Sequence, residues 1–443
     1  MGTATTRDMP RTAPRETRSR DTVGAAWREA RFAFRNAPAY RKLLLSAGID
    51  PGGQTGEAAF RELPLTDKEF YRSNYPAGVV AGSQVAAHDR HVLKSHSSGT
   101  GGDRLTTVAY TYDLARRMSA TTSVYPALKT TLLGLGSQRI ARYAAPNCSD
   151  VECAVPNSTM ESRMLRDGTL VLPVGHDLLA TSEAQVTQAM EEIGGYRPDW
   201  FYTDATHFAF LIRQYLARGE SLPRPAAVIL TYTLATRVAR RQIREALGDG
   251  VPIAEVVSMS ELGWVAMECQ LGRLHLNNSA FHVELLDRVA LTPVSQGQIG
   301  ELVVTSLGDR LLPHIRYRTG DLYRLMAPCA CGHPAPAVRH EGRALHFLRS
   351  PDSRTVSPKE LDDIVGADPQ VIAYRMQQVS DRRFRFKFIP APTAPTSAGD
   401  ALGARLRSAL GPQSLVDVQR VDYIPSERSG KFLSCVSDVA GTC

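Results

Sequence analysis

Short β-rich runs alternate with helical segments through the middle of the chain, and this alternation constrains the fold more than any other feature. Apolar runs predict strands at 226–230, 253–257, 281–286 and 300–305. Apolar residues spaced by three and four positions predict helices at 182–193, 208–218 and 235–247. Alternation of this kind is typical of α/β layers, in which helices cover the faces of a sheet. The expected fold class is therefore α/β.

The N-terminal end differs from the middle. Residues 1–22 are rich in Thr, Arg and Pro and lack apolar periodicity, which predicts a disordered tail. From Val23 onward the apolar spacing predicts a helix, and Pro38 separates it from a second one. The folded part of the chain is therefore expected to begin with a helical hairpin.

A stretch containing Pro and Gly at 327–342 interrupts the alternation. Beyond it, the patterns predict helices at 358–365 and 401–410 and strands at 371–376 and 383–390. We therefore expect two domains of unequal size, a large one over 23–342 and a small α+β one over 343–443.

The composition is that of an ordinary globular protein and excludes several classes of function. No run approaches the roughly 18 to 20 apolar residues of a membrane span, and the N-terminus lacks the apolar stretch of a signal peptide. The net charge of +7 includes no block of consecutive basic residues, so neither nucleic acid nor membrane is an expected partner. Seven cysteines, an odd and low number, argue against a secreted disulfide framework. A cytoplasmic location is expected.

A run rich in glycine and hydroxyl side chains lies at 95–102 and reads SHSSGTGG. Glycine tolerates positive φ and lets the backbone approach a ligand, so such a loop can turn N–H groups and hydroxyls toward one anion. We interpret it as a phosphate cradle, with a surface loop as the alternative. It lacks the lysine that follows the glycines of a P-loop, so a GTPase-like fold is not indicated.

Three further runs each carry one group suited to nucleotide chemistry. In RYRTGDL at 316–322, Asp321 can accept two hydrogen bonds from a ribose diol. In SMSELG at 258–263, Glu261 follows an apolar strand and can hold Mg²⁺ beside a triphosphate. In PSERSGK at 425–431, Lys431 follows a glycine and can bring a cation to a developing negative charge. The alternatives are a solvent-facing turn, a helix cap and a lysine without function.

In this order, the four runs resemble motifs of the adenylate-forming (acyl-CoA synthetase) superfamily, in its phenylacetate-coenzyme A ligase-like branch. Further stretches extend the resemblance over most of the chain: 38–41 (PAYR), 63–68 (LPLTDK), 268–269 (EC), 300–303 (GELV) and 342–343 (GR). The resemblance implies a large N-terminal adenylation domain of layered sheets and helices, and a small mobile C-terminal lid domain that carries the catalytic lysine. ATP would bind between the two.

The resemblance also implies roles for individual residues. Lys431 would bridge the attacking carboxylate and the α-phosphate, and Glu261 would ligate Mg²⁺. Asp321 would bind the ribose hydroxyls, and Arg343, at the hinge, would bind the nucleotide. Further ATP contacts would come from the glycine-rich run and from the serine before Glu261, namely Ser97, Ser98, Gly99, Thr100, Gly101 and Ser260.

The sequence departs from the resembled pattern at four places. Asp103 follows Gly102 where a lysine is usual, and Val257 stands where an aromatic residue would stack on adenine. Residues 231–234 replace an acidic, glycine-containing turn, and residues 344–347 replace an acidic hinge. These departures predict an altered acyl pocket and leave open whether coenzyme A is the acceptor.

Two pairs of residues supply a Cys₃His set suited to tetrahedral zinc. Cys269 and His275 are separated by five residues, and Cys329 and Cys331 by one. All four ligands would come from the protein and leave no open position, so a structural role is expected. His333 is a spare candidate, and four residues without a metal are the alternative. The other cysteines have no assigned role: Cys148, Cys153, Cys435 and Cys443.

The function predicted from these observations is ATP-dependent adenylation of a small carboxylic acid, with aromatic acids among the candidates, followed by transfer to a nucleophile such as coenzyme A. His207, Thr231 and Tyr232 are candidates for the substrate pocket. For His207, the pattern favours the alternative, a helix N-terminus that packs on the core. The acceptor can instead be an amine or a carrier protein, and the oxyanion can be nitrite, for diazotisation of an aromatic amine. A non-catalytic nucleotide-binding protein is the second alternative, and a homodimer remains open.

Overall fold

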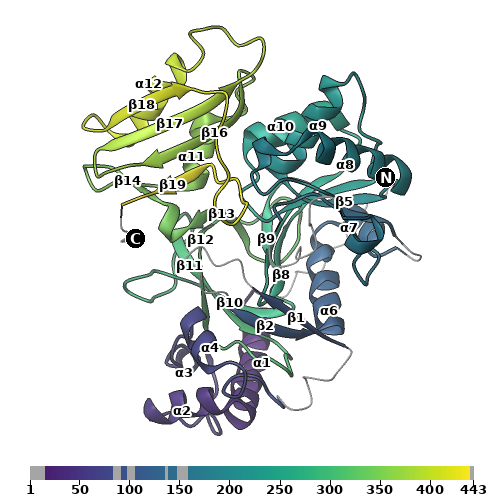
Figure 1. Ribbon diagram of the computed structural model, residues 1–443. Helices are drawn as coiled ribbons and strands as arrows, with labels where there is room; N and C mark the ends of the chain where they lie inside the picture. Colours follow the sequence, from purple (N-terminus) through teal and green to yellow (C-terminus); the bar gives the residue numbers. More distant parts are fainter. Residues whose placement is uncertain (1–14, 83–90, 97–104, 135–137, 147–157, 440–443) are drawn as a thin grey trace, which may run out of the picture.

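A sheet of eleven strands forms the centre of the molecule (Figure 1), and one half of it is parallel. The computed structural model describes residues 15–82, 91–96, 105–134, 138–146 and 158–439. Within them the strand order is β10-β11-β12-β13-β9-β8-β7-β6-β5-β3-β4. The parallel half consists of β3 (Ile140–Arg142), β4 (Leu170–Val171), β5 (Trp200–Asp204), β6 (Ala227–Thr231) and β7 (Ile253–Met259).

The other half of this sheet is antiparallel, from β7 outward. Its strands are β8 (Gly263–Glu268), β9 (Leu274–Leu276), β10 (Phe281–Leu286), β11 (Ile299–Ser306), β12 (Tyr317–Leu325) and β13 (Ala337–Arg343). Most neighbouring strands here are consecutive in the chain, but β9 lies beside β13, which follows it about 60 residues later. The change from parallel to antiparallel pairing therefore falls at β7.

Three helices cover one face of the parallel half: α8 (Glu183–Tyr196), α9 (Ala205–Ala217) and α10 (Arg237–Leu247). Each begins where a side chain caps it: Ser182 accepts from Gln185 N, Asp204 from His207 N, and Thr236 from Ala239 N. The opposite face meets α6 (Thr111–Thr121) and α7 (Pro126–Leu132). The α/β class predicted from the alternating pattern is thus confirmed.

Along each parallel strand, successive side chains point to opposite faces of the sheet. Phe201 and Val228 pack with α8 to α10, whereas Trp200, Tyr202 and Ile229 pack with α7 and β8. Side chains alternate across a strand, so one strand can support the helical core and also line a space on its other side. The candidate site described below occupies that other side.

The N-terminal end of the described chain is helical: α1 (Arg15–Asn36), α2 (Pro38–Ser46), α3 (Glu57–Arg61) and α4 (Lys68–Asn74). The hairpin predicted around Pro38 is present. However, α1 begins at Arg15, inside the segment predicted as a tail, and a run of Arg, Glu and Asp is compatible with a helix even without an apolar face. Residues 1–14 lie outside the described residues.

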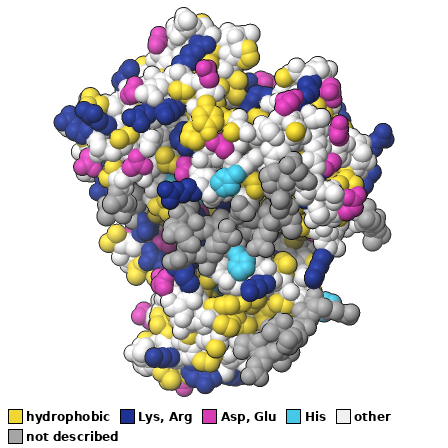
Figure 2. Space-filling view, viewed as in Figure 1, with side chains coloured by type: hydrophobic (Ala, Val, Ile, Leu, Met, Phe, Trp, Pro, Cys, Tyr) yellow, Lys and Arg dark blue, Asp and Glu magenta, His cyan; other side chains and the backbone are white. Residues whose placement is uncertain are grey.

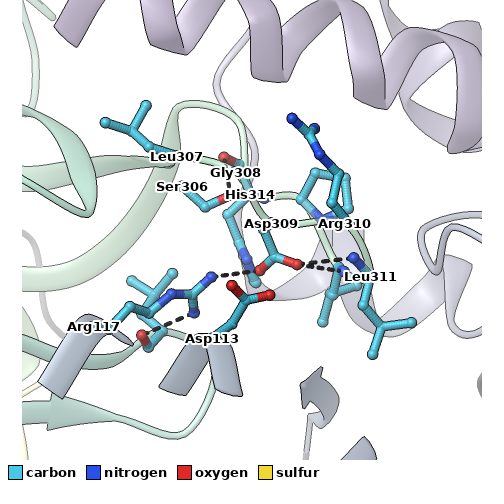
Figure 3. A network of polar contacts seen from close by, with 12 residues as sticks. Asp113, Arg117, Ser306, Leu307, Gly308, Asp309, Arg310, Leu311 and His314 are labelled. Atoms are coloured by element: carbon cyan, nitrogen blue, oxygen red, sulfur yellow. Dashed lines mark hydrogen bonds and ion pairs between the residues drawn. The ribbon is translucent and has the colours of Figure 1, made fainter. Parts of the chain in front are cut away.

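A buried polar network anchors α1 and α6 to the loop between β11 and β12, and Figure 3 shows its part around Arg117 and Asp309. Arg117 of α6 donates to Asp309 Oδ2 over 2.7 Å and to Leu262 O over 3.1 Å. Asp309 Oδ1 accepts from two backbone N–H groups, at Leu311 and Leu312. Glu29 of α1 accepts from Gly308 N and Asp309 N over 2.9 Å each. This loop is therefore held by buried ionic hydrogen bonds, in addition to the apolar packing of Leu311 and Leu312.

The C-terminal unit, from β14 to β19, has its own sheet and its own core. Its four-stranded sheet has the order β18-β17-β16-β19 and packs against two helices through Phe384, Phe386, Leu402 and Leu406. Its elements are β14 (Leu348–Arg349), β15 (Thr355–Val356), α11 (Pro358–Val365), β16 (Val371–Gln378), β17 (Arg383–Pro390), α12 (Asp400–Leu410), β18 (Leu415–Arg420) and β19 (Cys435–Ser437). In Figure 1 this unit lies beside α10.

The surface carries mixed charge. Figure 2 shows basic and acidic side chains interspersed over the face in view. In the part of the chain that the structure describes, no helix is both long enough and apolar enough to cross a membrane.

Candidate active site

A cavity of about 1530 Å³ lies between the large sheet and the C-terminal unit. Small-molecule sites typically measure about 300–1,000 Å³, so this cavity is large enough for a nucleotide-sized ligand. Among the charged residues that line it, five interact with one another, and we call them the polar cluster: Lys68, Glu261, Asp321, Arg343 and Lys431. They come from α4, the β7–β8 turn, β12, β13 and the segment before β19, and only the fold brings them together.

Asp321 and Arg343 face each other across the β12–β13 pair. Arg343 Nε lies 3.5 Å from Asp321 Oδ1, and His340 Nε2 lies 3.6 Å from the same oxygen. Burial by itself raises the pKa of Asp321, but Arg343, His340 and Lys68 outweigh it and hold the pKa at about 2. The carboxylate is therefore ionised at neutral pH and can accept hydrogen bonds from a ligand.

Glu261 lies on the tight turn between β7 and β8, and is buried. Its Oε1 accepts a hydrogen bond of 2.7 Å from the Tyr317 hydroxyl, and Lys68 Nζ lies 3.9 Å from the same atom. Ser260, beside it, lines the cavity, and its carbonyl accepts from Thr107 Oγ1 over 3.3 Å. The turn thus presents a fixed carboxylate of the kind that binds a hard divalent cation.

Lys431 reaches the cavity from a tight turn. Gly430 N donates to Glu427 O over 2.7 Å, and Glu427 N donates to Lys431 O over 2.9 Å. Gly430 has φ of 77°, and a Cβ there would lie 3.2 Å from the carbonyl oxygens of Pro146 and His176. Only glycine combines this φ with so close an approach. The glycine before the lysine thus lets the turn lie directly on the large sheet unit.

Hydrogen bonds hold the C-terminal unit in this position, and we call those at Asp177 the docking contact. Asp177 accepts from Ser426 N over 3.2 Å and from the Tyr423 hydroxyl, and Leu178 N donates to Ser426 Oγ over 3.0 Å. On the other side, Gln242 of α10 donates to Ile372 O over 2.9 Å. The docking contact lies on the same segment as Lys431 and so fixes where that side chain enters.

An aromatic wall, formed by Tyr202, Tyr232 and Trp264, lines another part of the cavity. The rings of Tyr202 and Trp264 are nearly parallel, at 5° and with centroids 5.9 Å apart. The Arg142 guanidinium lies over the Tyr202 ring at 5.2 Å. Tyr232 has φ of 74°, a conformation that is rare outside glycine and is typical of functional sites. These surfaces suit a flat apolar ligand.

Of the predicted pocket residues, two lie at the cavity and one does not. Thr231 and Tyr232 line it, and the Thr231 hydroxyl lies 3.1 Å from Ser258 Oγ. His207 is fully buried in α9, where its Nδ1 lies 3.0 Å from Asp204 Oδ1. His207 therefore lies in the core, as the alternative interpretation had it, because Asp204 caps the helix and orients the ring inward.

The predicted phosphate run, Ser97 to Gly101, lies outside the described residues. The strand before it, β1 (Val92–His96), pairs antiparallel with β2 (Thr106–Tyr110) and lines the cavity with Lys94 and Ser95. Sequence reasoning missed Tyr202, Trp264 and Arg142. The alternation of β5, in which Trp200 and Tyr202 face away from Phe201, was the signal that could have found the first of them.

The four predicted metal ligands come together next to β9. The ligand atoms of Cys269, His275, Cys329 and Cys331 all lie within 4.8 Å of one another. His275 Nδ1 lies 3.0 Å from Ala335 O, which leaves Nε2 facing Cys331 Sγ at 3.4 Å. Such a second hydrogen bond is typical of a metal-binding histidine. The donor set fits zinc, and His333 is not part of the group.

The fold is that of adenylate-forming ligases. The crystal structure of 2-hydroxyisobutyryl-CoA ligase with 2-HIB-AMP, in the postadenylation state, matches with a TM-score of 0.73 over 98% of this chain and 94% of that one, at 16% identity. The same protein in the thioesterification state gives 0.58 over 96% and 91%. Amide bond synthetase McbA from Marinactinospora thermotolerans gives 0.52 over 78% and 67%, at 16% identity.

In sequence, the chain is similar to phenylacetate-coenzyme A ligases, and the predicted resemblance is confirmed. The enzyme of Thermus thermophilus is 28% identical over 317 residues, which is 68% of this chain and 64% of that protein. The enzyme of Escherichia coli is 27% identical over 319 residues, 67% and 64%. The chain thus spans about 64% of the length of these curated relatives. No model of a protein family matches it.

Proposed function

We propose that this protein is an ATP-dependent adenylate-forming ligase. A carboxylate oxygen attacks the α-phosphorus of ATP, which gives an acyl adenylate and pyrophosphate, and the acyl group passes to a nucleophile such as coenzyme A. The observation that carries the proposal is the convergence of the polar cluster on one large cavity beside an aromatic wall. The names of the similar proteins, which are CoA ligases, support the same class of reaction.

Each member of the polar cluster has a distinct role in this proposal. Asp321 accepts hydrogen bonds from the ribose hydroxyls, and Arg343 contacts the nucleotide. Glu261 ligates Mg²⁺, which supplies charge neutralisation at the phosphates. Lys431 bridges the attacking carboxylate and the α-phosphate. In-line displacement needs positioning and charge compensation more than it needs proton transfer, and these are what the cluster offers.

The remaining assignments belong to the same proposal. Backbone and hydroxyl groups of the run Ser97 to Gly101, with Ser260, hold the ATP phosphates. The large domain covers 23–342 and the lid domain 343–443, with Arg343 at the hinge. The acid is small and aromatic, because Tyr202, Tyr232 and Trp264 offer flat apolar surfaces beside the cluster.

A screen of carboxylic acids for pyrophosphate release in the presence of ATP and Mg²⁺ tests the proposal. We expect at least one aromatic acid to raise pyrophosphate release well above the rate without acid. Mass spectrometry of the products, with coenzyme A or an amine added, then identifies the acceptor. The screen includes nitrite. If pyrophosphate is released with nitrite but with no carboxylic acid, nitrite takes the place of the carboxylate as the attacking oxyanion. A protein that binds ATP but releases no pyrophosphate with any oxyanion would contradict it.

Asp321→Asn is expected to weaken AMP binding by about tenfold or more, because hydrogen bonds to a charged group contribute roughly 1.5–3 kcal/mol. Calorimetric titration with AMP measures this. Burial and pairing keep Asp321 ionised, with a pKa of about 2, so its contribution to binding is constant between pH 5 and 8 and is lost only as pH falls toward 2. Asp417→Asn, on the exposed edge strand β18, is the control and should bind AMP normally.

We further propose that Cys269, His275, Cys329 and Cys331 hold a structural zinc ion that ties β8 and β9 to the β12–β13 connection. Protein purified without added zinc is expected to contain about one zinc per chain by elemental analysis. Cys331→Ser should lower this content strongly, whereas Cys435→Ser, at a buried thiol outside the group, should not. Zinc near zero in the unchanged protein would remove the proposal.

A further inference from the structure

Lys68 is a member of the polar cluster for which the motifs assign no role. It is the first residue of α4, and its side chain lines the cavity with 28% of its surface exposed. Its Nζ lies 3.9 Å from Glu261 Oε1, too far for a hydrogen bond. The Lys68 ammonium therefore lies next to Glu261, the carboxylate proposed to ligate magnesium.

The backbone around Lys68 is fixed. Thr66 N donates to Arg316 O over 3.1 Å, Arg318 N donates to Thr66 O over 2.8 Å, and the Thr66 hydroxyl donates to Ile315 O over 2.7 Å. Asp67 then caps α4 by accepting from Phe70 N over 2.9 Å. These bonds join the segment to the beginning of β12, the strand that carries Asp321. The distance between Lys68 and the nucleotide-binding groups is therefore set by the large sheet.

The ammonium of Lys68 has donors to offer. It carries three N–H groups. Among the described residues it makes the ion pair with Glu261 and donates no hydrogen bond. By contrast, Glu261 already accepts from Tyr317, and Arg343 is paired with Asp321. Lys68 is thus a cation with unused hydrogen-bonding capacity at the wall of the cavity.

The net charge of the polar cluster indicates what kind of ligand Lys68 would bind. The polar cluster contains Lys68, Arg343 and Lys431 against two carboxylates, so it carries an excess of positive charge that favours an anion. A divalent cation held by Glu261 would compete with Lys68 for that carboxylate and would repel the ammonium. Lys68 would then be stabilised by a further anion close by, and ATP phosphate oxygens in the cavity would provide that negative charge.

We propose that the Lys68 ammonium binds a β- or γ-phosphate oxygen of ATP and stays with the leaving pyrophosphate. This inference rests on the proposed function. In the reaction the carboxylate oxygen forms a bond to the α-phosphorus, the bond from that phosphorus to the bridging oxygen breaks, and the electron pair leaves with pyrophosphate. Lys68 transfers no proton. It neutralises the charge that accumulates on the leaving group, while Lys431 acts at the attacking side.

Calorimetric titration with two nucleotides tests the proposal without turnover. AMP lacks the leaving phosphates, and α,β-methylene-ATP has them but cannot be cleaved at the reacting bond. We expect Lys68→Met to weaken binding of the triphosphate analogue by about 10- to 100-fold and to leave AMP affinity within about twofold. Lys68→Arg should restore part of the loss. Lys42→Met, at an exposed position of α2, should behave as the unchanged protein.

The outcomes separate Lys68 from its neighbours. If Lys68→Met weakens the binding of AMP and of the analogue equally, Lys68 only maintains the structure of the site, and the proposal is overturned. The proposal is also overturned if neither affinity changes. Repeating the titration with EDTA separates Lys68 from the metal, since a loss of analogue affinity that appears only without Mg²⁺ would mean that Lys68 merely replaces the missing cation, and would also overturn the proposal. An unchanged protein that binds neither nucleotide would refute the proposed function, whereas tight analogue binding by Lys68→Met refutes this inference only.

Discussion

Lys431→Ala is expected to lower acid-dependent pyrophosphate release by roughly 10²-fold or more, while the protein remains folded. Lys431 enters the cavity from a glycine turn that lies on the large sheet unit, and the proposed mechanism uses its charge when the carboxylate meets the α-phosphate. Removing a group that acts mainly in the transition state typically costs about 10²–10³-fold in rate. Single-turnover formation of the adenylate, followed by mass spectrometry, measures the step directly.

The control for this prediction is Lys387→Ala, on β17. Lys387 belongs to the same small unit but does not line the cavity, so the rate should be unchanged. AMP affinity measured on Lys431→Ala separates chemistry from binding, since Asp321 and Arg343 are left intact. Pyrophosphate release at the normal rate in Lys431→Ala would remove this residue from the mechanism.

Arg117→Ala is expected to destabilise the protein by about 3–5 kcal/mol, the largest effect on stability that we predict. Arg117 is fully buried and donates to Asp309 over 2.7 Å, and the Asp309 carboxylate is itself 4% exposed (Figure 3). Alanine would leave this carboxylate without its cation in a site closed to water. Denaturant unfolding followed by circular dichroism gives the change in the free energy of unfolding.

A neighbouring arginine on the same helix provides the comparison. Arg116 also forms an ion pair, with Asp113 over 3.4 Å, but its side chain is 45% exposed. Solvent screening limits such pairs to about 0–1 kcal/mol, so Arg116→Ala should change stability little. If the two variants lose the same free energy of unfolding, burial does not determine how much the Arg117–Asp309 pair contributes to stability.

Much of the secondary structure could be predicted because it depends on local periodicity. The strand at 281–286, the helix at 358–365 and the strand at 383–390 were predicted with the bounds that the structure has. The beginning of α1 at Arg15 could not be predicted in this way, since Arg15 to Thr22 show no apolar pattern. Strand order was also out of reach, because β9 pairs with β13 across 60 residues of chain.

Some residues of the candidate site could be predicted from the sequence, and others could not. Asp321, Glu261 and Lys431 could be proposed from sequence because each lies in a short run with glycine or hydroxyl neighbours. Trp264 and Tyr202 could not, because a strand residue that faces a cavity has the same apolar character as one that faces the core. The Cys/His group could be proposed from ligand types, but its closeness depends on pairing between β9 and β13.

The docking contact at Asp177 has a consequence for how such an enzyme would turn over. Ser426 and Tyr423, on the segment that leads to Lys431, donate hydrogen bonds to Asp177 of the large sheet unit, and Ser426 also accepts one from Leu178 N. Each hydrogen bond contributes about 1 kcal/mol net, and Ile424 and Phe432, on either side of the turn, also pack into the apolar core of the large unit, so these contacts must break before the lysine can leave. Withdrawing the lysine is therefore a separate step from the chemistry. Its rate, rather than the displacement at phosphorus, can set the pace of the whole cycle.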